Sequence, residues 1–189
     1  MSSPDLTDAE RRAVQDVLNT PNLSMGARIE AFEAAVREHT GLRHAIGVNS
    51  GTAGLHLCVR AAGIQPGDLV LTTPFSFVAS TNVILFERAI PVFVDVDVQT
   101  GNINPELAAE AARDLMKGGA AARRWLPRQL PMPPGPLKAL LAVDVFGQPA
   151  DYHPLQRTAD EHGLRLIEDC CEALGAEYKG RKAGGFGDY

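Results

Sequence analysis

From residue 44 to residue 169, short apolar runs alternate with stretches of helical periodicity, and this alternation constrains the fold more than any other feature of the chain. Most of the apolar runs are hydrophobic at consecutive positions, which is typical of strands that are buried on both faces of a sheet. Strands separated by helices pair in parallel. The pattern therefore predicts an α/β fold, a mostly parallel sheet with helices on both faces. We expect strands at 45–48, 69–71, 91–94, 137–146 and 165–167, and helices at 52–62, 77–88, from 104 onward and at 152–162.

Two segments lie outside this alternation. Residues 1–40 are predicted to form an N-terminal helical segment, because Thr7 and Glu10 fit a capping box and a second amphipathic pattern covers residues 28–39. Residues 118–136 hold five prolines, which exclude regular structure there and predict an exposed, mobile loop. The rest of the chain, residues 41–189, is expected to belong to one larger domain.

Charge and composition exclude several classes of protein. Eighteen basic and 23 acidic residues give a net charge of −5, the wrong sign for a protein that binds nucleic acid through bulk charge. No apolar stretch approaches the ~20 residues that a membrane span needs. The three cysteines and five histidines form no cluster suited to a metal. Since no secretory signal is visible, we predict a cytoplasmic protein with free thiols.

Residues 49–53, Asn-Ser-Gly-Thr-Ala, are a candidate phosphate site, because they lie between a predicted strand and a predicted helix. Backbone N–H groups at a helix start point outward at the positive end of the helix dipole, where an anion binds well. Gly51 allows close approach of the main chain, and the Thr52 hydroxyl can donate a further hydrogen bond. The segment matches neither of the common glycine-rich nucleotide motifs. An ordinary helix N-cap is the alternative interpretation.

Two more candidates follow predicted strands. Asp169 comes after the strand at 165–167, where ligands of open α/β sheets bind, and a carboxylate there can hold a protonated ring nitrogen. Phe75 or Phe77 follows the strand at 69–71 and offers a flat face for stacking on a planar cofactor. The alternatives are an aspartate that caps the next turn and phenylalanines that belong to the core.

Taken together, these segments resemble the N-terminal half of the PLP-dependent sugar aminotransferases of the DegT/DnrJ/StrS type. The similarity extends from about residue 23 to residue 189 and rests on motifs that follow the order seen in the family. They are Phe32-Glu33, Val48 to Leu57, Pro74 to Ser80, Ala89 to Asp97, Val145 to Asp151, and Ile167 to Asp169 leading to Ala173 to Arg181. The resemblance implies the fold of aspartate aminotransferase, a fold-type I PLP enzyme, of which residues 41–189 would be an incomplete large domain.

The resemblance also implies a cofactor, pyridoxal 5′-phosphate (PLP), and roles for individual residues. Gly51, Thr52 and Ala53 would hold its phosphate. Phe77 would stack on its pyridine ring, and Asp169 would pair with the ring nitrogen, which keeps the ring protonated.

Two departures from the family bear on what the chain can do by itself. Glu172 stands where many members have Gln or His near the 3-hydroxyl of the cofactor, and an ionised carboxylate there would repel a phenolate oxygen unless the two share a proton. The Schiff-base lysine of the family falls beyond Tyr189, and the C-terminal small domain is also absent. The lysines that are present match other positions, so no catalytic residue is assigned and this chain alone is expected to be inactive; they are Lys117, Lys138, Lys179 and Lys182.

The parent protein is expected to be a PLP-dependent aminotransferase of polysaccharide or antibiotic sugar biosynthesis. It would move an amino group from an amino acid, with glutamate favoured, to a nucleotide-linked keto-sugar, and it would act as a homodimer. Two alternatives stay open. A sister branch of the family has His in place of the lysine and dehydrates deoxysugars. The chain could also be a non-catalytic fragment or binding module, since half a fold leaves apolar surface uncovered.

Overall fold

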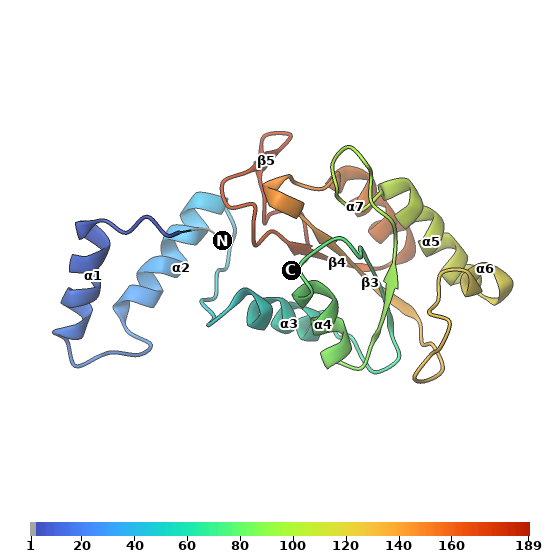
Figure 1. The fold of residues 1–189 in the computed structure, drawn as a ribbon, viewed down its shortest axis with the longest axis horizontal. Helices are drawn as coiled ribbons and strands as arrows, with labels where there is room; N and C mark the ends of the chain where they lie inside the picture. Colours follow the sequence, from blue (N-terminus) through green and yellow to red (C-terminus); the bar gives the residue numbers. More distant parts are fainter. Residues whose placement is uncertain (1–2) are drawn as a thin grey trace. The chain divides into compact units, whose positions relative to one another are not determined.

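The structure, a computed structural model, describes residues 3–189 (Figure 1). Its internal contacts divide the chain into two compact units, with the boundary after Gly47. The sequence pattern puts this boundary at residue 40. Each unit has its own set of secondary structure elements.

The first unit contains two helices, α1 (Asp8–Leu18) and α2 (Ala27–Thr40). α1 begins at the predicted capping box, in which Thr7 Oγ1 and Glu10 Oε2 each accept a backbone N–H of the first turn. α2 ends at Gly41, whose φ of +73° is the left-handed conformation that terminates many helices. Neither helix contains a buried residue, so residues 3–47 of this unit have helices but no core of their own.

The predicted strand at 45–48 is wrong, because this segment is irregular in the structure. The N–H of Gly47 donates to Glu33 Oε1 of α2 at 2.7 Å, and Ile46 is 79% exposed. An apolar run becomes a strand only where a neighbouring strand pairs with its backbone groups. Residues 45–48 have the composition of a strand, but the backbone N–H of Gly47 donates to the Glu33 side chain instead of to a neighbouring strand.

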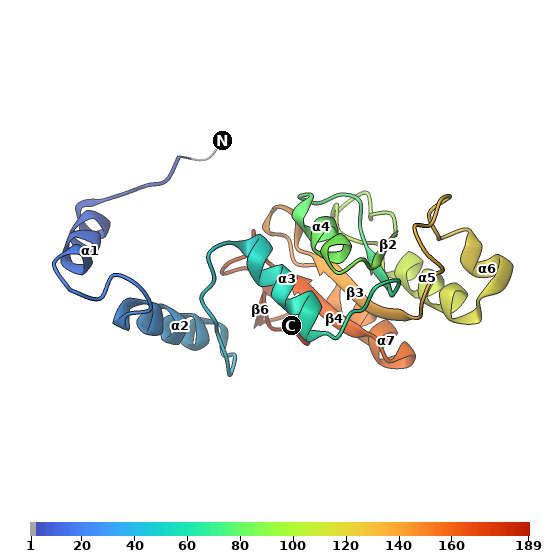
Figure 2. The same cartoon turned by 90° about the horizontal axis from the view of Figure 1, so that it is seen from below.

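The second unit is a parallel sheet covered by helices (Figures 1 and 2). Its strands pair in the order β2-β1-β3-β4, all in parallel, which confirms the predicted α/β fold. A short 3₁₀ turn, η1, follows β3, and a small hairpin of β5 and β6 follows β4. The strands are β1 (Leu69–Thr72), β2 (Ile90–Phe93), β3 (Leu137–Val143), β4 (Arg165–Asp169), β5 (Glu177–Tyr178) and β6 (Arg181–Lys182). The helices are α3 (Gly51–Ala61), α4 (Ala79–Phe86), α5 (Pro105–Lys117), α6 (Gly119–Arg123), η1 (Val145–Gly147) and α7 (Tyr152–His162).

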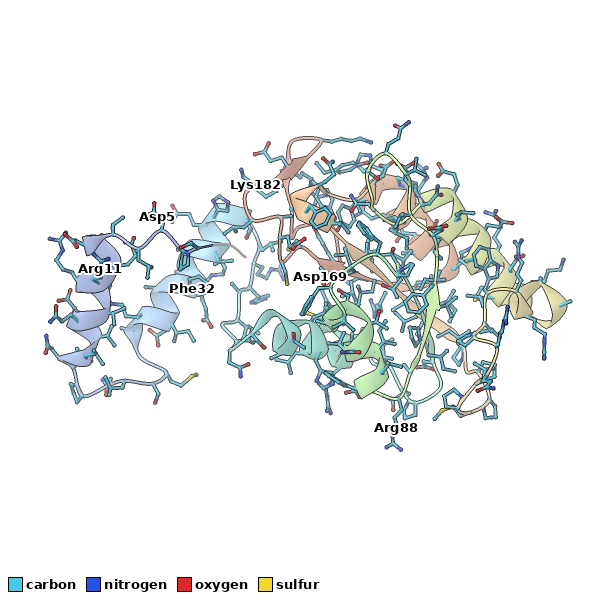
Figure 3. All side chains as sticks on the ribbon, viewed as in Figure 1. Asp5, Arg11, Phe32, Arg88, Asp169 and Lys182 are labelled. Atoms are coloured by element: carbon cyan, nitrogen blue, oxygen red, sulfur yellow. The ribbon has the colours of Figure 1, made fainter. Side chains whose placement is uncertain are left out.

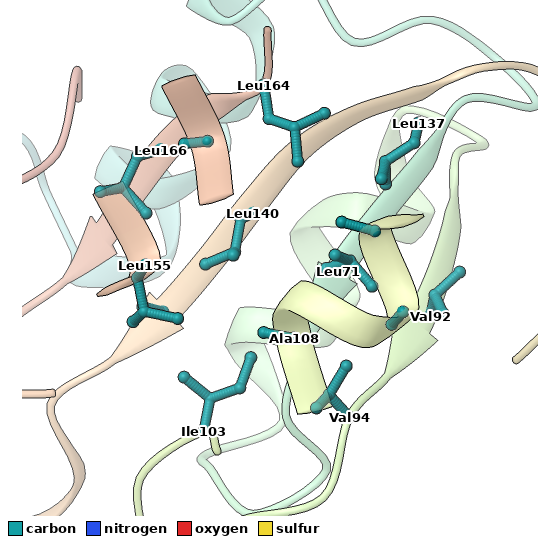
Figure 4. Packing of buried hydrophobic residues seen from close by; sticks show 14 of the residues in the cluster. Leu71, Val92, Val94, Ile103, Ala108, Leu137, Leu140, Leu155, Leu164 and Leu166 are labelled. Carbon is teal, nitrogen blue, oxygen red and sulfur yellow. The ribbon is translucent and has the colours of Figure 1, made fainter. Parts of the chain in front are cut away.

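Side chains that alternate along the strands supply two separate cores, because successive residues of a strand point to opposite faces of the sheet. In β3, Leu140 belongs to the core formed with α5 and α7, whereas Leu141 belongs to the core formed with α3 and α4. Both side chains are fully buried. Figure 4 shows the first core, in which Leu140 shares the space between sheet and helices with Ala108 of α5 and Leu155 of α7.

The expectation that residues 118–136 lack regular structure is wrong in part, since Gly119–Arg123 forms the five-residue helix α6. The indole N–H of Trp125 donates to Asp114 Oδ2 of α5 at 2.9 Å, and the guanidinium of Arg124 bonds to the same carboxylate. The alanines of α6 favour a helix, and the prolines that signal a loop all lie after it.

The direction of the chain changes between β1 and β3. From β1 the chain moves outward to β2, then crosses over β1 to reach β3 and β4. α4 follows β1 on one face and α7 follows β3 on the other, so a crevice opens at the carboxyl ends of these strands. The predicted strand at 137–146 is too long for this reason: β3 ends at Val143, and residues 145–147 turn as η1 at the crevice.

The two cores, one on each face of the sheet, lead to a prediction about stability. Leu140→Ala empties a fully buried site and is expected to lower the free energy of unfolding by about 2–5 kcal/mol in urea denaturation. Leu174→Ala, at a position that is 83% exposed, is the matched control and should change it by less than about 0.5 kcal/mol. Equal effects of the two substitutions would contradict the described core.

Candidate functional site

A cavity of about 540 Å³ lies at the crevice. It is bordered by the start of α3, the loop after β1, the turn η1 after β3 and the residues that follow β4. Because parallel strands end at one edge of a sheet, four segments that are far apart in the sequence share this cavity. Five of the six residues predicted to bind a cofactor line it: Gly51, Thr52, Phe77, Asp169 and Glu172. Ala53 is not among the lining residues.

The start of α3 presents two backbone amides to the cavity. Ser50 caps this 11-residue helix, and its Oγ accepts the N–H of Ala53 at 3.2 Å. Within residues 3–189, the N–H groups of Gly51 and Thr52 donate to no protein acceptor. They lie at the positive end of the helix dipole, which favours an anion. The amide of Ala53 already has a partner, so the amides of Gly51 and Thr52 are the ones that this helix start offers to an anion.

The thiol of Cys171 packs against the backbone of Gly51. A Cβ on Gly51 would lie 3.0 Å from Cys171 Sγ, so only glycine fits here without displacing the thiol. Burial, together with a hydrogen bond to Asp169 and the charge of its carboxylate, raises the pKa of the Cys171 thiol to about 12. At neutral pH the thiol is therefore uncharged and serves as an apolar wall of the cavity.

Asp169, labelled in Figure 3, lies at the end of β4, and it is only 8% exposed. Ser80 Oγ of α4 donates to Asp169 Oδ2 at 2.8 Å, and the Cys171 N–H donates to Oδ1 at 3.3 Å. Ser76 Oγ lies 2.8 Å from Ser80 Oγ and extends this chain of hydroxyls. A carboxylate has about four lone-pair sites, so it retains capacity for a ligand donor. Sequence reasoning assigned no role to Ser76 or Ser80, although both lie in a motif that follows a predicted strand.

Phe75 and Phe77 follow β1, and both line the cavity. Their side chains are 47% and 76% exposed, which excludes the alternative that they are core residues. The ring of Phe77 is therefore accessible to a planar ligand. The ring of Phe75 contacts Phe146 of η1 edge to face, with ring centroids 5.9 Å apart at an angle of 84°.

Glu172 lines the cavity, but its carboxylate already has a partner in the protein. Glu172 Oε2 accepts the N–H of Phe146 at 2.9 Å. Phe146 has φ +54° and ψ +26°, a left-handed conformation that costs a residue with a side chain about 1–2 kcal/mol. The next residue, Gly147, also has a positive φ, and a Cβ there would lie 3.0 Å from the Glu172 carbonyl oxygen. Glu172 thus holds the turn η1, and its contact with a cofactor oxygen stays a prediction.

A second buried carboxyl, Asp144, lines the same cavity and is absent from the sequence-based candidates. Its Oδ1 accepts hydrogen bonds from the Tyr152 hydroxyl at 2.6 Å and from the Ala150 N–H at 2.9 Å. Within the described part of the chain, Oδ2 has no hydrogen-bond partner. Burial raises the pKa of Asp144 to about 6, although the two hydrogen bonds oppose this shift. No sequence signal separates this aspartate from a solvated one, because its burial results from packing by α7.

The charges around the cavity are unbalanced. Asp144, Asp169 and Glu172 line it, and no lysine or arginine among residues 3–189 does so. An anion at the start of α3 would therefore depend on amides and hydroxyls, whereas the acidic wall favours a cationic group. Across the same residues, no group of three or more His, Cys, Asp or Glu side chains is arranged to hold a metal ion. Nor does this part of the chain contain a helix long and apolar enough to cross a membrane.

Free amides at a helix start and a buried aspartate share one cavity at the switch point of a parallel sheet, an arrangement typical of α/β domains that bind a ligand at this edge. The sequence matches the DegT/DnrJ/EryC1/StrS aminotransferase family over residues 4–189, and the chain belongs to this family.

Three relatives illustrate the match. GDP-perosamine synthase from Caulobacter vibrioides is 36% identical over 189 residues, which cover 100% of this chain and 45% of that protein. The aminotransferase from Psychrobacter cryohalolentis is 34% identical, with a TM-score of 0.81 over 99% of this chain and 42% of that one. E. coli GDP-4-keto-6-deoxy-D-mannose-3-dehydratase with bound hydrated PLP shares the fold at 24% identity, with a TM-score of 0.81 over 98% and 44% of the two chains. The chain spans less than half the length of these relatives.

Glu172→Ala removes the acceptor that holds the left-handed Phe146, and it is expected to lower the free energy of unfolding by about 1–3 kcal/mol. Glu172→Gln keeps an acceptor oxygen and should retain most of this stability. Urea denaturation measures both. Equal destabilisation by Glu172→Gln and Glu172→Ala would show that the acceptor oxygen of residue 172 does not hold this turn.

Asp144 should make stability depend on pH. Its pKa is about 6 in the folded chain against an ordinary value of 3.8, so the folded state binds more protons between these two values. The free energy of unfolding should therefore fall as the pH rises from about 4 to about 6, and stay level above that. In wild type, this decrease in the free energy of unfolding is on the order of 1–3 kcal/mol. Asp144→Asn is uncharged and still accepts the Tyr152 hydroxyl, so its free energy of unfolding should not show the decrease. Urea denaturation at several pH values between about 4 and about 7 tests this prediction. If the free energy of unfolding depends on pH in the same way in wild type and Asp144→Asn, the prediction is wrong.

Proposed function

We propose that this chain is the cofactor-binding part of a PLP-dependent aminotransferase that acts on a keto-sugar carried on a nucleotide. The amino donor is an amino acid, for which we favour glutamate. One observation carries the proposal: the two free amides of α3 and the buried carboxylate of Asp169 lie on a single cavity. Membership of the family and the similarity to GDP-perosamine synthase support the class of substrate.

The residues present fit PLP. Its phosphate suits the amides of Gly51 and Thr52, in a place that a side chain on residue 51 would fill. Its protonated ring nitrogen suits the carboxylate of Asp169, and the exposed ring of Phe77 offers a stacking surface. A cavity of about 540 Å³ also leaves space for part of a substrate.

When bound, PLP supplies an electron sink for the carbon atom next to the transferred nitrogen. Asp169 holds the proton on the ring nitrogen, because a carboxylate within hydrogen-bond distance favours the charged form of its partner. Ser80 fixes the orientation of this carboxylate, and Ser76 fixes Ser80. Overall, the amino acid becomes a 2-keto acid and the sugar ketone becomes an amine. The exchange therefore needs no outside oxidant or reductant.

The remaining groups come from other parts of the assembly in this proposal. The proton shuttle at the substrate carbon requires a base, and no lysine of residues 3–189 lines the cavity. The phosphate would also gain from cationic side chains, which the described lining does not contain. We place the lysine in the rest of the whole protein and the further cations in the second subunit of a homodimer.

Asp169→Asn tests the cofactor site directly, since an amide cannot supply the negative charge that holds the ring proton. The variant should bind PLP roughly ten- to hundredfold more weakly than the wild-type 189-residue chain in equilibrium dialysis. Asp160→Asn, an exposed carboxylate of α7 outside the cavity, is the matched control and should bind like wild type. Circular dichroism checks that each variant is folded. Failure of the folded wild-type chain to bind PLP, or equal binding by Asp169→Asn, would overturn the proposed function.

A further inference from the structure

Phe146 combines two features that folding does not explain. It is a non-glycine residue with φ +54°, and its side chain is 82% exposed. The left-handed conformation is unfavourable for a residue with a side chain, and an exposed ring recovers little free energy by burial. Glycine would make the same turn without strain. Strained residues concentrate at ligand-binding positions, which points to a use for the ring itself.

The protein holds this ring in place from two directions. Glu172 Oε2 accepts the Phe146 N–H at 2.9 Å and so fixes the backbone of the turn. The ring of Phe75 contacts the ring of Phe146 edge to face, at an angle of 84°. Phe75 is itself supported at Gly101, where an added Cβ would lie 3.3 Å from Phe75 Cε1. Phe75 and Phe146 thus form a right-angled aromatic wall.

The aromatic wall borders the same cavity as Asp169 and the start of α3. In the proposed function, the helix start takes the cofactor phosphate, while Asp169 and Phe77 take its ring, so the aromatic wall has no part in holding the cofactor. An acceptor accompanies it on the cavity lining, the exposed carboxylate of Glu172, of which Oε2 accepts the Phe146 N–H. A surface that joins aromatic faces to hydrogen-bond acceptors suits a ligand with a C–H face and hydroxyl groups at its rim.

On the basis of the proposed function, we propose that the aromatic wall is a subsite for the hexose ring of the substrate. The C–H face of the sugar packs on Phe146 and Phe75, and a sugar hydroxyl donates toward the neighbouring Glu172 carboxylate. In a nucleotide-linked sugar, two phosphates separate the hexose from the base. A cavity of about 540 Å³ that also holds the cofactor therefore leaves the base outside. The subsite selects for the sugar ring and is indifferent to the base.

Saturation-transfer-difference NMR on the 189-residue chain with PLP and GDP-mannose tests this subsite, because the method detects weak binding. Phe146→Ala should reduce the transfer to the mannose ring protons roughly two- to tenfold and leave transfer to the guanine proton nearly unchanged. Phe146→Tyr keeps the ring and should retain the mannose signal. Phe86→Ala is the matched control: Phe86 is 56% exposed and has one edge contact, with His56, but lies outside the cavity lining.

The same samples separate this inference from the proposed function. PLP binding without saturation of the mannose protons, or with equal saturation in wild type and Phe146→Ala, would overturn the sugar subsite and leave the cofactor site intact. A mannose signal that depends on Phe146 in a chain that does not bind PLP would overturn the proposed function alone. A loss of the mannose signal in Phe86→Ala would show that Phe146 has no special part in it.

Discussion

The carboxylate of Asp169 is nearly buried at the end of a parallel strand, and the rest of the site is arranged around it. An ionised carboxylate in such a place is costly unless donors surround it. Ser80, 89 residues earlier in the sequence, provides one donor, and the main chain just beyond β4 provides another. This network joins the end of β4 to the start of α4, and so brings the helix that follows β1 and the last strand of the sheet to one cavity.

The charge of that cavity determines which ligands suit it. Carboxyl groups on the lining favour a cationic ring nitrogen, whereas the start of α3 favours a phosphate through its backbone amides rather than through lysine or arginine. PLP carries both groups at a fixed separation, one anionic and one readily protonated. The turn η1 adds strain and exposed aromatic surface to this arrangement, and Glu172 stabilises it through the Phe146 N–H.

Several features could be predicted from residues because they depend on local physics. The parallel sheet follows from consecutive apolar positions in strands such as β3, and the start of α1 follows from Thr7 and Glu10. Asp169 could be singled out because it follows a predicted strand. Other features depend on a neighbour that no local pattern contains: the segment at 45–48 lacks a paired strand, Asp144 is buried by α7, and Ser80 meets a carboxylate from β4.

The amino-acid sequence by itself determined the class of fold and the motifs of the family, because hydrophobic periodicity and helix caps act over a few residues. Only the tertiary structure decided which of these motifs share a cavity. It also showed that the Glu172 carboxylate accepts a backbone N–H of a strained turn, and that one oxygen of Asp144 has no hydrogen-bond partner within residues 3–189. The physical reason is that burial and hydrogen bonding depend on which segments pack together in three dimensions. The order of strands in the sheet decides this, and that order differs from their order in the chain.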